Sequence, residues 1–275
     1  MPRLLLLLAI LSTTACHGAR VARPYPDPGA EAVVAYLTSL RERVHTLRAE
    51  TLSDARIGND RANVTVYILA GWGGKLRYMA MNPGGGAMAA DLASDGVQFC
   101  FVDSNKNCGD CGPATPENVG QLLRVVMQPD DVVTMMFGGT PVLAGATPTL
   151  AWDASEGHEI LTLAGQDGSK QRIVLDGVGH RWDVIESELK NPDGKLAFRI
   201  RHKGFHAVKS AAGVELRVPG KSYFEQPGND ALISWKEQEL DVELEPAKFH
   251  IDMPVGLPQC GGGNAGNAAP PAAGR

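Results

Sequence analysis

The chain has 275 residues, and its 31 acidic side chains outnumber the 26 basic ones, giving a formal net charge of −5 at pH 7. Because charges of both signs are spread along the chain, no basic face is expected, and nucleic acid is excluded as a partner. A chain of this length can bury the core of one large domain.

The first residues have the pattern of an export signal. Arg3 precedes an apolar run at residues 4–11, which is too short to span a bilayer as a helix, and small polar residues follow it. Residues 11–16, Leu-Ser-Thr-Thr-Ala-Cys, resemble the lipobox of bacterial lipoproteins, in which the cysteine becomes the first mature residue and is acylated. We therefore expect a signal peptide at residues 1–15 and a lipid on Cys16, with ordinary secretion and a free thiol as the alternative.

The residue after Cys16 bears on the destination. His17, not aspartate, follows the cysteine, and by resemblance to the sorting rule of enterobacterial lipoproteins this favours the outer membrane. The implied location is lipid-anchored and periplasm-facing, with the cell surface as the alternative.

Both ends of the mature chain differ in composition from its middle. Residues 16–29 contain three prolines and no apolar period, which predicts a lipidated, extended tether. Residues 260–275 carry no large apolar side chain, which predicts a disordered tail. The folded domain is expected to span residues 30–259.

Helices are predicted in two regions. Apolar residues at three- and four-residue steps predict an amphipathic helix from Val33 to Leu47. In the middle of the chain, Thr115 and Pro116 would begin a second helix, and a third would follow Pro129 and end before Gly138.

Most of the remaining chain has strand patterns of two kinds. In the C-terminal half, residues 195–201, 215–218 and 239–244 alternate between apolar and charged side chains, so each strand should have one wet face. In the N-terminal half, residues 64–69 and 97–102 are apolar on both faces, which predicts that this part of the sheet is covered on both faces or lines an apolar space. Turn sequences at 166–168, 191–194 and 226–229 separate strands at hairpin distances, so the sheet should be antiparallel.

This order of elements resembles the LolA and LolB-like lipoprotein carriers and their lipoprotein relatives. The resemblance covers residues 30–257, and residues 232–244 followed by 249–254 are similar to the last strands of that fold. It implies an α+β fold, an antiparallel half-open β-barrel covered by a few helices. It also implies that the concave apolar interior accepts the acyl chains of lipoproteins.

An acyl-chain site needs apolar side chains on the concave face of the sheet and on the inner faces of the helices. Methionine suits such a site because its flexible thioether adapts to irregular ligands. The alternative is that these residues are simply the packed core. The candidates, as a group, are Met79, Met81, Phe99, Phe101, Val126, Met127, Met136 and Phe137.

Four cysteines besides Cys16 form an even set in an exported chain, where disulfides are the default. The sequence leaves three pairings open among Cys100, Cys108, Cys111 and Cys260. Cys108 and Cys111 have C-x-x-C spacing but lack the strand-to-helix context of a redox motif. A structural bridge is therefore favoured over catalysis, and no second pair at zinc-ligand spacing is present.

No catalytic constellation emerges. There is no Gly-x-Ser-x-Gly elbow, and His202 and His206 stand four residues apart on an expected strand, too far apart to share a metal, where both are predicted to be surface residues. We therefore expect no enzyme, no cofactor and no metal. Two functions remain: a carrier or acceptor of lipid or lipoprotein acyl chains, or a structural and assembly lipoprotein that uses the fold as an interaction platform. An exported hydrolase ranks third.

Overall fold

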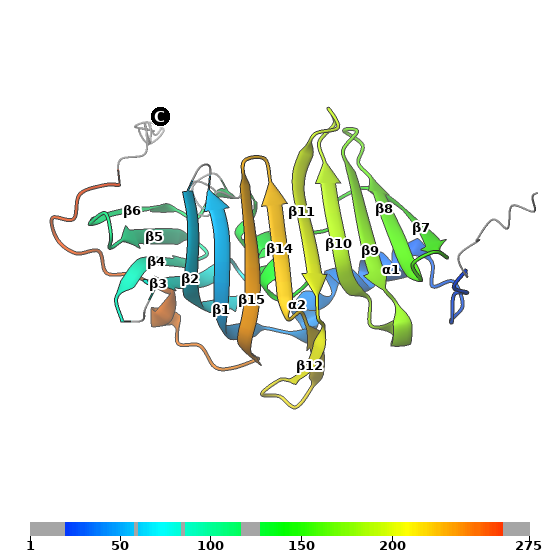
Figure 1. The fold of residues 1–275 in the computed structure, drawn as a ribbon, viewed down its shortest axis with the longest axis horizontal. Coiled ribbons are helices and arrows are strands. Elements are labelled where there is room, and N and C mark those ends of the chain that lie inside the picture. Colours follow the sequence, from blue (N-terminus) through cyan, green and yellow to red (C-terminus); the bar gives the residue numbers. More distant parts are fainter. Residues whose placement is uncertain (1–19, 58–59, 84–85, 117–126, 261–275) are drawn as a thin grey trace, which may run out of the picture.

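The computed structural model describes residues 20–57, 60–83, 86–116 and 127–260, and shows one large sheet with short helices (Figure 1). The helices are α1 (Ala30–Thr38), α2 (Leu40–Arg43), α4 (Pro129–Met136) and the 3-10 turns η1 (Val178–His180) and η2 (Pro246–Phe249). The strands are β1 (Thr46–Ile57), β2 (Asp60–Gly71), β3 (Lys75–Met81), β4 (Met88–Asp95), β5 (Gln98–Asp103), β6 (Cys108–Pro113), β7 (Thr147–Asp153), β8 (His158–Ala164), β9 (Lys170–Asp176), β10 (Asp183–Lys190), β11 (Leu196–Lys203), β12 (His206–Lys209), β13 (Glu215–Val218), β14 (Lys221–Gln226) and β15 (Asn229–Leu240).

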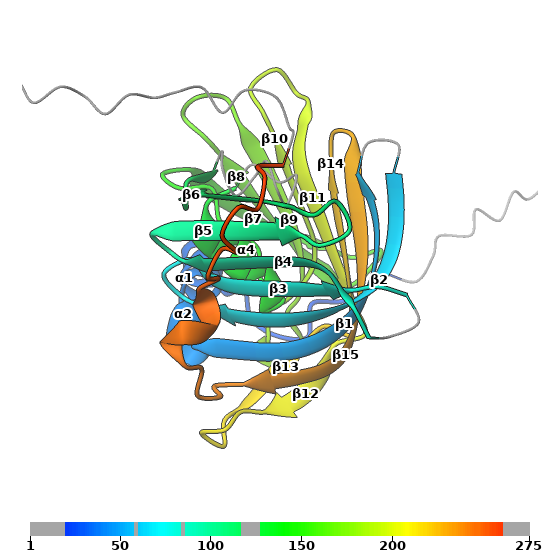
Figure 2. The same ribbon diagram turned by 90° about the vertical axis from the view of Figure 1, so that its left-hand side faces the viewer.

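Thirteen strands form one antiparallel sheet in the order β6-β5-β4-β3-β2-β1-β15-β14-β11-β10-β9-β8-β7, and β12 pairs with β13 in a separate small sheet. The large sheet does not close, because β6 and β7 end it without pairing to each other. Figure 2 shows the sheet bending strongly, so that β3 to β5 lie across the direction of β8 to β11. The expectation of an antiparallel, half-open barrel covered by a few helices is confirmed.

The bend gives the sheet an inner face with two apolar clusters. One cluster packs α4 residues such as Val133 against β1 and β2, through Leu47 and Ile68. The other packs Val33 and Leu37 of α1 against β8 and β9. Each helix therefore covers its own half of the concave face, which is why the apolar stripes of α1 and α4 exist.

The hairpin turns lie where the sequence predicts them, while the first helix ends early. Gly168, Gly194 and Gly228 have φ values of 93°, 80° and 81°, which suit the tight turns of these hairpins. The first helical region stops at Arg43 instead of Leu47, because Val44 is already extended, with φ −145°. Leu47 remains buried, but on the inner face of β1, since it fits both a helical stripe and an alternating strand.

One predicted strand is shorter than expected, and another is present but lies outside the large sheet. The last strand of the large sheet ends at Leu240, because Asp241 has φ 56° and its side chain accepts a hydrogen bond from the His45 amide. Residues 242–244 are therefore not a strand. Residues 215–218 are a strand as expected, but they pair only with β12.

The described part of the expected tether is bound to the sheet. The Val21 amide donates to the Ala154 carbonyl at 2.8 Å, and the Trp152 indole donates to the Val21 carbonyl at 2.8 Å. Arg23 reaches Glu159 on β8. Residues of this segment, Val21 and Arg23, thus have partners on β8 and on or beside β7 although they precede Ala30.

The C-terminal segment, residues 245–260, runs over β3 to β6 on the outer face (Figure 2). Arg77 donates to the carbonyls of Lys248 and His250 at 3.0 and 2.8 Å, and it also pairs with Asp91. Gly109 donates to the Pro258 carbonyl at 2.9 Å. In the described part of the chain, no helix is long and apolar enough to cross a membrane.

Candidate functional site

Five of the predicted acyl-chain residues lie on the inner side of the sheet, in or against the packed core. Phe99 and Phe101 point inward from β5, opposite Ser94 and Leu92 of β4. Around α4, Met127, Met136 and Phe137 are buried in the same cluster against which Phe101 packs. Val126 lies outside the described residues.

Met79 and Met81 lie on the opposite face of the sheet. On β3, Leu76, Tyr78 and Ala80 face the core. Because side chains alternate along a strand, Met79 and Met81 point to the outer face. Met79 stands opposite Tyr67, whose side chain is 40% exposed. The eight candidates therefore do not form one surface, because alternation places these two methionines away from the concave face.

A cavity of about 610 Å³ opens at the rim of the sheet, between α1 and α2 on one side and the β12–β13 hairpin on the other. We call it the rim pocket. Its apolar lining comes from Tyr36, Leu37, Leu40, Val44, Phe137, Trp182, Val184, Phe205, Ala212, Val214, Leu216, Val218 and Leu240. Among the predicted site residues that the structure describes, Phe137 alone lines it.

Glycines allow the walls of the rim pocket to approach each other closely. Gly138 follows α4 with φ 81°, and a Cβ there would lie 2.5 Å from Pro219 in the link between β13 and β14. Gly220 donates to the carbonyls of Lys203 and Gly204 at 3.0 Å, which turns the small β12–β13 sheet away from the large one. The hairpin thus forms a wall beside α2 instead of continuing the barrel.

The deep end of the rim pocket is defined by Trp182. It is 7% exposed and has φ 49°, an uncommon backbone conformation for an aromatic residue. Its ring packs edge-on against the ring of Tyr25, with 5.8 Å between the ring centroids, so the N-terminal segment supports Trp182. The loop before β10 is therefore held in a strained form by contacts on both sides.

Two ion pairs join charged groups that line the rim pocket. Arg217 donates to Asp183 at 2.7 Å, and burial raises the pKa of Asp183 while Arg217 opposes that rise. Asp241 pairs with His45 at 3.3 Å.

Arg43 has no ion pair among the described residues, but it is held by Tyr36. Its guanidinium stacks over Tyr36 at 4.0 Å, Nη1 donates to the Tyr36 hydroxyl at 2.8 Å, and Nη2 donates to the Tyr36 carbonyl at 3.2 Å. The Tyr36 hydroxyl in turn donates to the Arg181 carbonyl at 2.9 Å. The sequence did not indicate this cluster, because Arg181 lies 145 positions after Tyr36 and no motif links the two.

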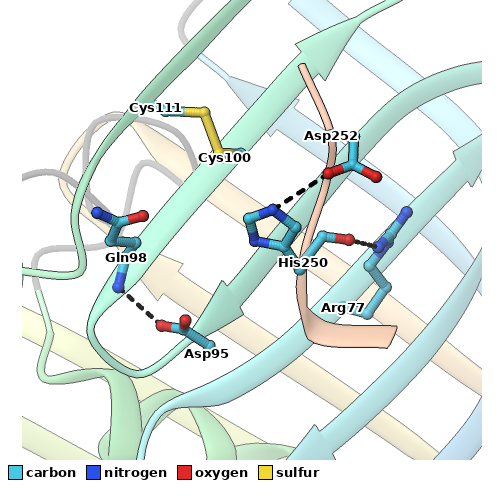
Figure 3. Close-up of a disulfide and its surroundings, with 7 residues drawn as sticks. All are labelled: Arg77, Asp95, Gln98, Cys100, Cys111, His250 and Asp252. Atoms are coloured by element: carbon cyan, nitrogen blue, oxygen red, sulfur yellow. Dashed lines mark hydrogen bonds and ion pairs between the residues drawn. A yellow bond between two sulfur atoms is a disulfide. The ribbon is translucent and has the colours of Figure 1, made fainter. Parts of the chain in front are cut away.

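The four mature-domain cysteines form two disulfides, Cys100–Cys111 and Cys108–Cys260. Cys108 and Cys111 do not pair with each other, because three steps along β6 put their side chains on opposite faces. Figure 3 shows the Cys100–Cys111 bridge between neighbouring strands, near Arg77 and His250. Both disulfides thus tie the β5–β6 end of the sheet, one internally and one to the C-terminal segment.

Two further predictions concern possible ligands of metals and lipids. His202 is 1% exposed, so its prediction as a surface residue is wrong, while His206 is exposed as expected. Among the described residues, no group of His, Cys, Asp or Glu could hold a metal ion. Cys16, the predicted lipid attachment site, lies outside the described residues.

Comparison with known proteins finds no matching family model and no matching curated protein. Solved structures do match. A LolA superfamily protein from Nitrosomonas europaea aligns with TM-score 0.53 and 12% identity, over 81% of this chain and 98% of its own. A DUF1329 family protein from Desulfovibrio piger aligns with TM-score 0.52 and 12% identity, over 82% of this chain and 98% of its own.

A third structure, from Vibrio parahaemolyticus, is a domain assigned to outer membrane lipoprotein sorting. It aligns with TM-score 0.53 and 10% identity, over 80% of this chain and 95% of its own. At this level of identity the likeness concerns the backbone arrangement. The half-open sheet covered by short helices is therefore a LolA-like fold.

Proposed function

We propose that this protein binds an acyl chain in the rim pocket and acts as a carrier or acceptor of lipid or lipoprotein chains, without chemistry of its own. In this proposal it is anchored to the outer membrane through an acylated Cys16 and faces the periplasm. The observation that carries the proposal is the rim pocket itself.

The size and lining of the rim pocket support binding of a chain. Its volume of about 610 Å³ falls in the range of ~300–1,000 Å³ typical of small-molecule sites. Leu37, Leu40, Phe137 and Leu216 contribute apolar walls from four different elements. The names of the similar structures, LolA superfamily and outer membrane lipoprotein sorting, point the same way.

Mass spectrometry of copurified ligand tests this function. The full chain carrying Cys16→Ala, which removes the anchor site, is purified without added lipid and analysed under native conditions. We expect one bound lipid per chain. The matched variant Leu216→Asp places an unpaired charge in the apolar wall and should lose the ligand. Val97→Asp, at a position 75% exposed, is the control and should keep it.

A second candidate function is an interaction platform without a ligand. The observation in its favour is the inner face near α4, where Val133, Met136 and Phe137 already pack against the strands. On this reading the chain fills its barrel with its own side chains. Repeated recovery of ligand-free protein at full stability would favour the platform.

A further inference from the structure

Arg43 has spare hydrogen-bonding capacity in an apolar setting. A guanidinium carries five N–H donors, and within the described part of the chain two of those of Arg43 have acceptors, both on Tyr36. The Nε is buried and finds no partner among the described residues, and its burial keeps it out of reach of a ligand. The second N–H groups of Nη1 and Nη2 also lack an acceptor there, and Arg43 lines the rim pocket, so these two donors are the ones left for a ligand.

No protein carboxylate fills this role. Among the described residues, the ion pairs at the rim pocket join Arg217 to Asp183 and His45 to Asp241, and none includes Arg43. The two other carboxylates of the lining, Glu42 and Glu215, belong to exposed side chains. The cation of Arg43 is thus left for a group that the described chain does not provide.

The guanidinium is also held in place. Stacking on Tyr36 fixes the plane of the fork, and the Tyr36 hydroxyl is itself fixed by the Arg181 carbonyl. A planar guanidinium held in this way suits carboxylate and phosphate oxygens, which accept two parallel hydrogen bonds.

The volume limits how much lipid fits beside that cation. At ~30 Å³ for each non-hydrogen atom, the size of a water molecule's share of liquid, 610 Å³ holds roughly 20 such atoms. That is one acyl chain with its head group. Two or three chains would extend beyond the rim pocket.

We propose that the rim pocket takes a single-chain amphiphile whose anionic head, a carboxylate or a phosphate, binds Arg43. The chain then lies along Leu40, Phe137 and Leu216. This inference rests on the proposed function, because it names the class of ligand for the same pocket.

Calorimetric titration of three one-chain lipids tests it, using the full chain with Cys16→Ala after removal of bound lipid. The lipids are oleate, oleyl phosphate and the neutral oleyl alcohol, which share one 18-carbon chain and differ in the head group. We expect at least one of the two anions to bind about tenfold or more tightly than the alcohol, as a charge-assisted hydrogen bond implies. The tighter anion identifies the head group as carboxylate or phosphate.

Arg43→Gln should weaken binding of the two anions more than binding of the alcohol, and so remove the preference for the anion. Arg41→Gln is the matched control, because Arg41 lies two residues away, pairs with Asp130 and does not line the rim pocket. Should Arg43→Gln fail to fold, wild-type titrations at rising salt decide, since screening weakens an exposed or half-exposed charge contact and not an apolar one.

The outcomes distinguish binding of an anionic head group by Arg43 from binding of an acyl chain in the rim pocket. If the alcohol binds as tightly as both anions, or if Arg43→Gln weakens all three lipids equally, the anionic head is refuted while chain binding stands. If none of the three lipids binds the wild-type chain, the proposed function fails first.

Discussion

The guanidinium of Arg23 pairs with the carboxylate of Glu159, with Nε 2.8 Å from Oε1 and Nη2 3.0 Å from Oε2. The Glu159 side chain is fully buried on β8, and burial raises its pKa while Arg23 opposes the rise. The carboxylate also helps burial raise the pKa of Tyr25 to about 12. One buried ion pair thus connects the N-terminal segment to the sheet behind Trp182.

Removing the guanidinium of Arg23 should therefore destabilise the folded protein. Arg23→Gln leaves the carboxylate of Glu159 buried without its cation, and we expect a loss of about 3–5 kcal/mol in the free energy of unfolding. Because the folded-state pKa of Glu159 is raised, the loss should be largest at neutral pH and shrink as pH falls and the carboxyl is protonated.

Denaturant unfolding at pH 7 and pH 5 measures this effect. Arg56→Gln is the control, because Arg56 pairs with Asp230 at an exposed site where such pairs contribute about 1 kcal/mol or less. The double variant Arg23→Gln, Glu159→Gln should recover part of the loss. Equal losses for Arg23→Gln and Arg56→Gln would show that the buried pair is not an anchor.

His202 gives the fold a second pH dependence. Its ring is 1% exposed, with Nδ1 2.9 Å from the Ser222 hydroxyl and Nε2 3.2 Å from the Gly139 carbonyl. Burial lowers the pKa of His202 to about 4, so the folded protein holds this histidine neutral. Since the folded pKa lies below the unfolded one, stability is complete above about pH 6.5 and falls as pH decreases towards 4, by about 1.4 kcal/mol per unit.

His202→Gln should flatten the decline in melting temperature between pH 6.5 and pH 5. Glutamine can still donate to the Gly139 carbonyl and accept from Ser222, but it does not titrate. His206→Gln, at the exposed histidine four residues on, should leave the decline as it is in wild type. If the melting temperature of His202→Gln fell with pH as steeply as that of the wild type, other groups would cause the pH dependence.

The two disulfides should differ in their effect on stability. Cys108–Cys260 links residues 152 positions apart, and Cys100–Cys111 links residues 11 apart. In the chain-entropy view, closing a loop of ~100 residues stabilises by about 4.7 kcal/mol and closing one of ~15 residues by about 3 kcal/mol. Replacing Cys108 and Cys260 by serine should therefore destabilise more than replacing the other pair.

Urea unfolding of the two double variants gives the comparison. Loss of Cys108–Cys260 should also expose the end of the C-terminal segment to proteases, because near residue 260 the hydrogen bond that remains between the described segment and the sheet is from the Gly109 amide to the Pro258 carbonyl, while the Arg77 side chain and the buried Phe249 hold the segment farther back. Four free thiols per Cys16→Ala chain after non-reducing denaturation would refute both pairings.

Local patterns predicted much of this fold. The helix after Pro129, the hairpin turns at Gly168 and Gly194, and the alternating strand at Leu196–Lys203 depend on near neighbours in sequence, and the structure contains them. The early end of the first helical region was missed, because the spacing of Val44 and Leu47 fits both a helical stripe and the inner face of a strand.

The site was harder to predict for a different reason. Met79 and Met81 were chosen by residue type, whereas parity relative to Tyr78 decides which face they occupy. The rim pocket joins Arg43, Trp182 and Leu216, which the topology brings together from distant parts of the chain. Cysteine pairing likewise depends on register, since Cys100 stands directly opposite Cys111.

Acylation of Cys16 remains a prediction from the leader sequence. Metabolic labelling with a radioactive fatty acid should label the wild-type chain, and Cys16→Ala should be unlabelled and leave the membrane fraction. A wild-type chain without label would leave secretion with a free thiol as the better description.

The last prediction decides which face holds the acyl chain, the inner face near β5 or the rim pocket. Phe101 is half-buried and packs against the apolar cluster around α4, so Phe101→Asp places a carboxylate beside that cluster and should lower the free energy of unfolding. Because Phe101 does not line the rim pocket, the protein that remains folded should bind oleate with wild-type affinity.

Leu216→Asp should differ from Phe101→Asp in binding and not in stability. Leu216 is half-buried against the same apolar cluster as Phe101, so the loss of stability should be similar, but Leu216→Asp also places a charge beside the chain in the rim pocket. Affinity and melting temperature are measured on both variants, with Val97→Asp in the β4–β5 turn as the common control. If Phe101→Asp abolished binding in folded protein and Leu216→Asp did not, the inner face would be the site and the rim pocket would not.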